Sequence, residues 1–571
     1  MIPRQEHPKP QFRRDNWLNL NGVWEFEKDS GNSGSERGFE DKNHVFPLKI
    51  NVPFCPQSTL SGIADTDFMS SVWYRRTFVL SEADLDGRIV LHFGACDYFT
   101  TVFVNGKAAG THKGGYVSFS FDITGFVTPG ENILTVHAED NERDPLIPSG
   151  KQSRIYYSHG CDYTRTTGIW QTVWIEFTPK TYISGLKYFP SLENGTLTVI
   201  ADLRGAGILR VDSSFGGTDT GSAETESSGG QVTITLKLTE KHPWELGRGG
   251  LYDLTFTYGQ DVVHSYFGLR SISYRNKKFY LNGKSVFQRL VLDQGFYPSG
   301  IYTAPTDGEL EADVTRSMAM GFNGARLHQK VFEERFLYHA DRHGYIVWGE
   351  YPNWGLDHSR PDAIYGILPE WLEEVSRDFN HPSIVGWCPY NETWDVDRRP
   401  QINDVISIVY LATKAADPTR PCIDTSGNYH VAGYTDIYDV HDYNQNPDEV
   451  RSHYEKLTVG EYHEENSNVR GRQNYDNVLP FFVSEYGGIR WTDDRSGWGY
   501  GKGPETEDEF INRLKGLTDA LLDNPCIFAF CYTQLTDVEQ EQNGLYTYGR
   551  KPKFPPETVF PIFSRKAAVE D

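Results

Sequence analysis

The feature that most constrains this chain is a change of pattern at about residue 274. Beyond it, short apolar runs alternate with amphipathic stretches, as expected for strands and helices in turn. The candidate strands are residues 285–292, 322–328, 345–350, 383–391, 421–425, 436–442, 480–485 and 525–532. The candidate helices are residues 306–320, 332–343, 368–380, 402–416 and 507–522. This alternation predicts a (β/α)8 barrel; a doubly wound sheet is the alternative, although no glycine-rich loop follows the first strand.

The residues before this point read as two all-β domains. Residues 1–178 contain alternating runs at 72–79, 88–93 and 101–104, with turns between them, and predict a jelly-roll sandwich. Residues 179–273 contain strands at 196–200 and 231–236, and their length suits an immunoglobulin-like sandwich. The glycine-, serine- and threonine-rich stretch from Ser213 to Gly230 predicts a loop. We therefore expect domains at 1–178, 179–273 and 274–571, the last being the barrel.

Charge and composition exclude several classes of partner. The net charge of −23 argues against a nucleic-acid groove, which needs a basic surface. No run of 18 apolar residues is present, so we expect no membrane partner. The seven cysteines are scattered and form no CxxC pair, and the N-terminus has no apolar signal segment, so we expect a cytoplasmic protein. Aromatic residues make up 14% of the chain and suit stacking against the apolar faces of a small carbohydrate.

Two glutamates each follow a short apolar run within the predicted barrel. Glu392 follows residues 383–391, and Glu485 closes residues 480–485. Because strand ends meet at one rim of a barrel, the two carboxylates are expected to face one cavity. A pair of carboxylates is the minimum equipment for hydrolysing a glycosidic bond.

Several motifs in their order along the chain resemble glycoside hydrolase family 2, the family of β-galactosidases, β-glucuronidases and β-mannosidases. They are Asp15–Phe26, Thr167–Gln171, Tyr266–Arg270, Gly321–Arg326, Asn391-Glu392 and Ser484–Gly487. The resemblance covers nearly the whole chain. It implies a sugar-binding-like jelly roll, an immunoglobulin-like sandwich and a catalytic barrel, and exo-hydrolysis with retention of anomeric configuration. It also implies a homo-oligomer, a dimer or a tetramer.

The resemblance gives individual residues their expected roles. Glu485 is expected to be the nucleophile and Glu392 the acid/base, with their carboxylates roughly 5–5.5 Å apart. Arg326 and Tyr443 are expected to contact Glu485, and Asn391 the sugar 2-hydroxyl. The remaining candidates are Asp293, Gln294, Glu350 and His328 for further polar contacts, and Trp354 and Trp394 for stacking.

The chain also departs from the family. The β-galactosidase magnesium site lacks its histidine in Glu350–Trp354, so we expect no essential metal and no cofactor. The Asn-x-Lys pair that β-glucuronidases use to hold a uronate is replaced by an acidic run at 537–541, unless Arg550 or Lys551 folds in. These departures favour a neutral glycone, foremost a β-galactoside. The alternatives are an α-L-arabinosidase, a β-glucuronidase or a β-mannosidase, and, outside enzymes, a carbohydrate-binding protein.

Overall fold

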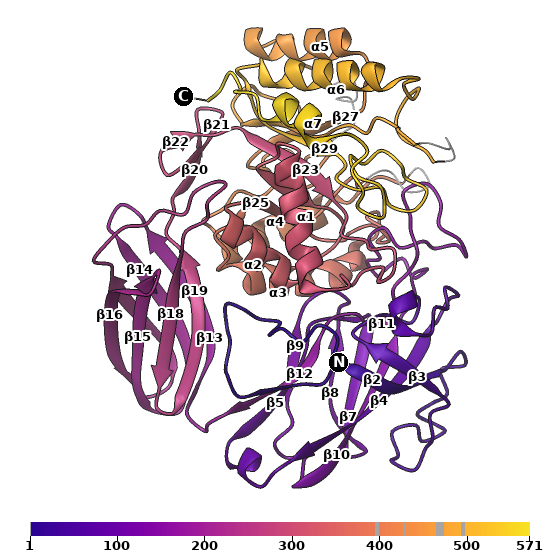
Figure 1. The fold of residues 1–571 in the computed structure, drawn as a ribbon, viewed down its shortest axis with the longest axis vertical. Helices are drawn as coiled ribbons and strands as arrows, with labels where there is room; N and C mark the ends of the chain where they lie inside the picture. Colours follow the sequence, from indigo (N-terminus) through magenta and orange to yellow (C-terminus); the bar gives the residue numbers. More distant parts are fainter. Residues whose placement is uncertain (1, 394–398, 428, 464–472, 493–496, 571) are drawn as a thin grey trace.

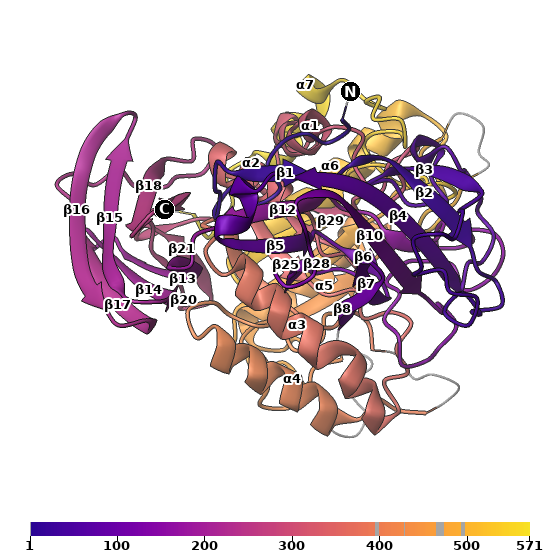
Figure 2. The same ribbon diagram turned by 90° about the horizontal axis from the view of Figure 1, so that it is seen from below.

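The computed structural model describes residues 2–393, 399–427, 429–463, 473–492 and 497–570. Figure 1 shows two β-rich units, in indigo and magenta, beside a unit of mixed helices and strands in orange and yellow. Seen from below in Figure 2, the indigo unit lies in front of the barrel and the magenta unit stands to one side.

The N-terminal unit is a two-sheet sandwich, as predicted. A four-stranded sheet has the order β1 (Trp17–Asn19), β12 (Val173–Thr178), β5 (Arg88–Phe93) and β9 (Phe119–Asp122). A six-stranded sheet has the order β3 (Leu48–Val52), β2 (Gly22–Lys28), β4 (Ser71–Leu80), β10 (Gly130–Glu139), β7 (Phe99–Val104) and β8 (Lys107–Lys113). Short strands β6 (Cys96–Asp97) and β11 (Gly168–Ile169) pair beside them. The side chains that point inward from both sheets form one apolar core. A long irregular segment connects β10 to β11 and extends to the barrel.

The second unit is also a sandwich, with one prediction overturned. Its sheets have the orders β13 (Tyr182–Ser191), β14 (Thr196–Arg204), β17 (Gly230–Lys237), and β16 (Thr218–Ser227), β15 (Gly207–Phe215), β18 (Leu251–Tyr258), β19 (Asp261–Gly268). The predicted loop from Ser213 to Gly230 is wrong, because β15 and β16 pair there as an antiparallel hairpin. β16 is an edge strand, so its small polar side chains can face solvent while its backbone completes the sheet.

Residues after the second unit form a small sheet and then the barrel. The small sheet consists of β20 (Ile272–Arg275), β21 (Lys278–Leu281) and β22 (Lys284–Ser285), so the boundary proposed at 273 falls inside β20. The barrel sheet is parallel where its strands pair, in the order β26 (Ile384–Cys388), β25 (Ile346–Glu350), β24 (Gly324–Leu327), β23 (Gln288–Asp293), β29 (Ile527–Thr533), β28 (Phe481–Gly487) and β27 (Tyr438–Asp442).

Helices follow most of the barrel strands. They are α1 (Asp307–Ala319), α2 (Glu334–His343), α3 (Ile364–Asp378), α4 (Asn403–Ala416), α5 (Pro447–Val459), α6 (Glu507–Leu522) and α7 (Pro556–Phe563). The hydroxyl of Thr306 caps α1 by accepting from the Glu309 backbone amide, a role that threonine often has just before a helix. The helices α5 and α7 were not predicted from the sequence.

The predicted fifth strand, residues 421–425, is not a regular strand. It joins β26 through the isolated bridge of Cys422 with Trp387, and Ile423 donates to the carbonyl of Trp387 at 2.9 Å. Toward β27 the contact passes through side chains: His430 lies 2.7 Å from Asp424 and 3.0 Å from Asp439. The barrel wall is therefore held at this seam by buried polar side chains in place of a second backbone ladder.

The N-terminal unit and the barrel share one apolar core. Tyr116, Tyr163 and Trp170 of the N-terminal unit belong to the same buried cluster as barrel residues such as Val291 and Tyr351. The N-terminal segment adds polar ties, since Arg4 pairs with Glu333 at 2.8 Å. Among the described residues, no helix combines the length and the apolar character needed to span a bilayer. The interface fixes the segment between β10 and β11 over the end of the barrel where the strands terminate.

Candidate active site

Glu485 lies inside β28, two residues before its end, with its side chain almost fully buried. Arg326, from the end of β24, donates through Nη1 to its Oε1 at 3.1 Å. The hydroxyl of Tyr443, which follows β27, donates to the other oxygen. Burial and the neighbouring carboxylate of Glu485 raise the pKa of Tyr443 well above its ordinary value, so this phenol stays a donor. The two contacts predicted for Glu485 are therefore present.

Glu392 lies four residues beyond the end of β26, in a loop and not at the last position of the strand. Its backbone has a φ of +49°, a conformation that is uncommon outside glycine, and its amide donates to the carbonyl of Ser426 at 2.8 Å. Its side chain is about one-eighth exposed (13%), so an incoming molecule can reach it. Gly427 lies against it, and a Cβ there would come within 3.2 Å of Glu392 Cγ.

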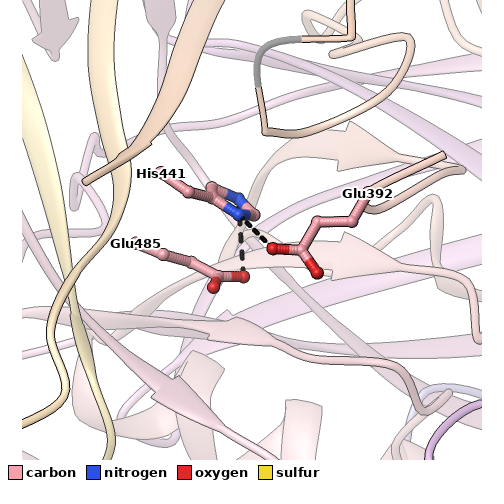
Figure 3. A group of neighbouring side chains, drawn as sticks. All are labelled: Glu392, His441 and Glu485. Atoms are coloured by element: carbon pink, nitrogen blue, oxygen red, sulfur yellow. Dashed lines mark hydrogen bonds and ion pairs between the residues drawn. The ribbon is translucent and has the colours of Figure 1, made fainter. Parts of the chain in front are cut away.

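His441, from β27, lies between the two glutamates (Figure 3). Its Nδ1 lies 2.6 Å from Glu392 Oε1 and its Nε2 lies 3.4 Å from Glu485 Oε1. Burial opposes protonation of the ring, but Glu485 and Glu392 outweigh it and raise the pKa of His441. One ligand atom from each of the three residues lies within 4.8 Å of the others.

The same three residues are a set that could hold a metal ion. A protonated imidazole cannot ligate a metal, and the raised pKa of His441 favours the protonated ring near neutral pH. Arg326 already donates to Glu485. These contacts make the group a poor resident metal site, and the expectation of no essential metal stays a prediction.

Arg326 connects the nucleophile candidate to its surroundings. It is buried, and it donates to Glu350 Oε2 at 2.6 Å and to Asn391 Oδ1 at 2.5 Å as well as to Glu485. Burial opposes its charge, but nearby carboxylates, Glu350 foremost, hold the pKa of Arg326 well above its ordinary value. Asn391 Nδ2 is then left buried without a hydrogen-bond partner among the described residues. A buried donor without a partner is costly, so this amide suits a ligand hydroxyl.

Family models match two parts of this chain. The model described as glycosyl hydrolases family 2, sugar binding domain, matches residues 24–179, and the one described as glycosyl hydrolases family 2, TIM barrel domain, matches residues 272–489. The chain belongs to glycoside hydrolase family 2. The family, the fold class and the glycoside hydrolase class predicted from the sequence are thereby confirmed.

Curated relatives of this family 2 chain carry two names. It is 24% identical to a β-glucuronidase of Pongo abelii over 74% of this chain and 71% of the relative. It is 26% identical to a β-galactosidase of Thermoanaerobacter pseudethanolicus, over 75% of this chain and only 57% of that relative. The two names differ in the sugar on which the enzymes act.

Solved structures resemble this family 2 chain over nearly its whole length. A β-glucuronidase from Ruminococcus gnavus in complex with N1-substituted uronic isofagomine has a TM-score of 0.79 at 18% identity, covering 98% of this chain and 100% of that one. A Bifidobacterium dentium β-glucuronidase complexed with coumarin-3-O-glucuronide has a TM-score of 0.81 at 19% identity, covering 98% and 99%. At these identities the likeness establishes a shared fold.

One predicted sugar contact of this family 2 chain needs correction, and a second is partly occupied within the protein. Both oxygens of Glu350 are used inside the protein, by Arg326 and by the backbone amide of Gln329 at 3.1 Å, so Glu350 supports Arg326 and does not face a sugar. Asp293 accepts from the Gly295 amide at 2.9 Å, and burial and then the negative charge of Asp313 raise its pKa to about 7. One oxygen of Asp293 is therefore taken up by its own loop.

The other predicted site residues lie in different surroundings. His328 is buried, with Nδ1 2.9 Å from Glu350 Oε1, and burial holds its pKa well below the ordinary value, so the ring is neutral. Trp354 is half-buried and donates through its indole to the carbonyl of Asn391 at 3.2 Å. Gln294 donates to the Tyr163 hydroxyl at 2.9 Å, and its Oε1 is buried without a described partner. Trp394 lies outside the described residues.

The acidic run at 537–541 is taken up by protein contacts. Asp537 accepts from Lys553 at 2.6 Å, Glu539 accepts from the amide of Thr164 at 3.2 Å, and Glu541 accepts from the Tyr163 hydroxyl. Arg550 does not reach the run; it donates to the carbonyl of Phe296 and pairs with Asp313. Glu539 and Glu541 therefore anchor the N-terminal unit on the barrel, and Asp537 pairs with Lys553 inside the barrel, so the run does not stand free to repel a uronate.

Several residues that lie at the site had no role predicted from the sequence. His441 bridges the two glutamates, and the ring of Tyr500 stacks on Tyr443 at 3.4 Å between ring centres. Lys151 and Tyr163 come from the all-β N-terminal unit and reach the barrel through its long segment. For His441, its position at a strand end was a usable signal; for Lys151 there was none in the sequence.

Proposed function

We propose that this protein is a retaining exo-β-glycosidase that hydrolyses a terminal β-linked sugar by double displacement. The observation that carries the proposal is the separation of the two carboxylates, whose closest oxygens lie within 4.8 Å of each other. Retaining enzymes hold the pair roughly 5–5.5 Å apart, whereas inverting enzymes need about 6.5–9.5 Å to admit a water.

The first step uses each glutamate differently. Glu485 attacks the anomeric carbon and forms a glycosyl ester while the bond to the leaving oxygen breaks. Glu392 gives its proton to that oxygen, which departs as an alcohol. In the second step Glu392, now a carboxylate, takes a proton from water, the hydroxide attacks the anomeric carbon, and Glu485 is released. Two inversions give net retention.

The surrounding donors suit these roles. Arg326 and Tyr443 aim charged and phenolic donors at Glu485, which must react as a carboxylate and must be a good leaving group in the second step. The unpartnered Nδ2 of Asn391 suits the 2-hydroxyl, whose hydrogen bond strengthens as positive charge develops on the sugar ring.

Two glycones are candidates within this function. The sequence favoured a neutral sugar, foremost a β-galactoside, because of the acidic run. The protein contacts of that run weaken this preference, and a β-glucuronide becomes a candidate of equal standing. Location in the cytoplasm and assembly into a dimer or tetramer stay predictions. All seven cysteines are free thiols, as expected of a protein in a reducing compartment.

The test of the reaction is a panel of 4-nitrophenyl β-glycosides followed by NMR of the product. We expect turnover of at least one member, with the β-anomer of the free sugar appearing first and mutarotating later. Appearance of the α-anomer first would refute retention. Absence of turnover on every neutral and acidic member would refute the glycosidase proposal.

A further inference from the structure

We propose that Lys151 is a substrate-binding residue that pairs with an acidic group of the glycone, the C6 carboxylate of a β-linked hexuronic acid. The proposal rests on the glycosidase function above and names the sugar class that this site accepts. The residue comes from the N-terminal unit, so the domain described as sugar-binding in the family would supply part of the catalytic pocket.

The loop that carries Lys151 is built against the barrel. The amide of Ser149 donates to the carbonyl of Trp354 at 2.7 Å, and the amide of Gly150 donates to the same carbonyl at 3.0 Å. Gly150 has a φ of +54°, and a Cβ there would lie 2.6 Å from the carbonyl oxygen of Gln329. Only glycine allows so close an approach, so Lys151 is held in a defined place.

Lys151 is buried, yet its charge is left without a protein acceptor. Lys151 is 5% exposed. Its Nζ lies 5.1 Å from the ring centre of Trp354 and 6.0 Å from that of Tyr163. Across the described ranges it forms no ion pair and no hydrogen bond through Nζ. An ammonium that is largely removed from water and has no protein acceptor would be stabilised by an acceptor that a ligand brings.

The charges around Lys151 place it beside the reacting groups. Burial opposes its charge, but the carboxylate of Glu541, followed by others that include Glu485 and Glu392, raises the pKa of Lys151 above its ordinary value. It also acts on His328, whose pKa it helps to lower. Lys151 is therefore a cation at neutral pH, within electrostatic reach of both catalytic glutamates.

Other cations near this end of the barrel are already engaged. Arg326 donates to Glu350 and Glu485, Lys553 pairs with Asp537, and Arg550 pairs with Asp313. Lys330 donates to the carbonyls of Gly295 and Tyr302. Each of these has a protein acceptor that a sugar carboxylate would have to displace, whereas Lys151 does not.

A second polar atom without a protein partner lies next to the ring of Tyr163, the ring that Lys151 also approaches. Gln294 donates to the Tyr163 hydroxyl, and its buried Oε1 has no described partner. This oxygen can accept from a sugar hydroxyl while Lys151 donates to a neighbouring acidic group. With Asn391 Nδ2 available for the 2-hydroxyl, the barrel offers one buried donor and one buried acceptor without partners, and Lys151 adds an ammonium from the N-terminal unit.

The test compares acidic with neutral substrates in matched variants. The kcat/KM values of wild type, Lys151→Gln, Lys151→Arg and the surface control Lys28→Gln are measured with 4-nitrophenyl β-D-glucuronide, β-D-galacturonide, β-D-galactoside and β-D-glucoside. We expect wild type to prefer a uronide. Lys151→Gln should lose about 100-fold on it, mostly through KM, and at most about threefold on neutral glycosides. Lys151→Arg should regain part of the loss, and Lys28→Gln should match wild type.

Two outcomes would overturn the proposal. Wild-type turnover confined to neutral glycosides would refute it while leaving the glycosidase function intact. An equal loss on acidic and neutral substrates in Lys151→Gln would show that Lys151 only balances the charge of Glu541. Retained turnover of neutral glycosides, or an unchanged unfolding temperature, shows that the variant is folded.

Calorimetric binding of free D-glucuronate and D-galacturonate gives a readout that does not depend on turnover. We expect binding of at least one by wild type, weakened by about 100-fold in Lys151→Gln, with D-galactose binding little affected. No binding of either acid to wild type would overturn the inference even if neutral glycosides were hydrolysed. Binding through Lys151 without any glycoside turnover would instead refute the proposed reaction alone.

Discussion

The Nδ1 atom of His441 lies 2.6 Å from a carboxylate oxygen of Glu392. The opposite nitrogen of the ring lies 3.4 Å from Glu485, so one imidazole contacts both carboxylates on which the proposed reaction depends. A proton on this ring lies within reach of Glu392, the group proposed to protonate the leaving oxygen. His441 is therefore a positioning residue that sets the charge balance of the resting site.

We expect His441→Asn to lose stability in a pH-dependent way. The glutamates raise the pKa of folded His441 above the ordinary 6.5. The stabilisation is then complete below about pH 6.5 and is lost as the pH rises through the raised value; each tenfold gain in proton affinity on folding contributes about 1.4 kcal/mol. The difference in unfolding temperature from wild type, measured by calorimetry, should be largest near pH 6 and smallest near pH 9. A constant difference would contradict a cationic His441.

Glu485→Ala is expected to lower kcat by at least about 10⁴-fold, because no other described group is placed to attack the anomeric carbon. Azide should restore part of the rate by entering the vacated space from the same face. The product would be a glycosyl azide of inverted configuration, identified by NMR. The exposed Glu505→Ala serves as control; a Glu485→Ala variant as active as this control would refute the nucleophile assignment.

Glu392→Ala should discriminate between leaving groups. Loss of the proton donor is expected to slow an alkyl glycoside by about 10²–10⁴-fold, whereas a 2,4-dinitrophenyl glycoside, whose leaving group needs no proton, should form the glycosyl-enzyme at nearly the wild-type rate. Pre-steady-state release of the phenol measures this step directly. Equal slowing of both substrates would mean that Glu392 acts in some way other than proton donation.

A comparison of two glycines with nearly the same backbone conformation tests the contact between the N-terminal loop and the barrel. Gly150 and Gly160 have φ of +54° and +53°, but a Cβ at 150 would lie 2.6 Å from the Gln329 carbonyl, whereas nothing lies within 4 Å at 160. Both alanine variants bear a similar backbone strain of about 1 kcal/mol. We expect Gly150→Ala to lower kcat/KM by at least about tenfold and Gly160→Ala by no more than about twofold. Equal effects would show that the loop contact does not matter.

Much of the catalytic centre could be predicted because parallel barrel strands all end at one rim. Glu485, Arg326 and Tyr443 are adjacent in space for that reason, although they are distant in the sequence. The same rule fails for Glu350, because a strand end gives the rim but not the direction of a side chain. Glu350 turns under Arg326, where both of its oxygens are used.

The remaining departures have local causes. The hairpin of β15 and β16 was read as a loop because its composition is polar, yet an edge strand needs an apolar face only where it meets the core. Residues 421–425 have a strand-like composition, but side chains such as Asp424 replace the backbone ladder toward β27. The position of Lys151 at the site could not be predicted, because no sequence pattern connects a loop of a β-sandwich with a distant barrel loop before the fold is known.

The apolar core that runs without a break from Tyr116 and Trp170 into the barrel has a consequence for how this protein can change. Under the role proposed for Lys151, the cleavage chemistry and part of the choice of sugar are encoded in separate stretches of the gene, yet they meet across a surface that cannot be parted without exposing that core. Mutations confined to the short buried segment around residue 150 would then redirect substrate preference while every catalytic strand is inherited unaltered. A barrel transplanted without its companion would lose both its solubility and its discrimination.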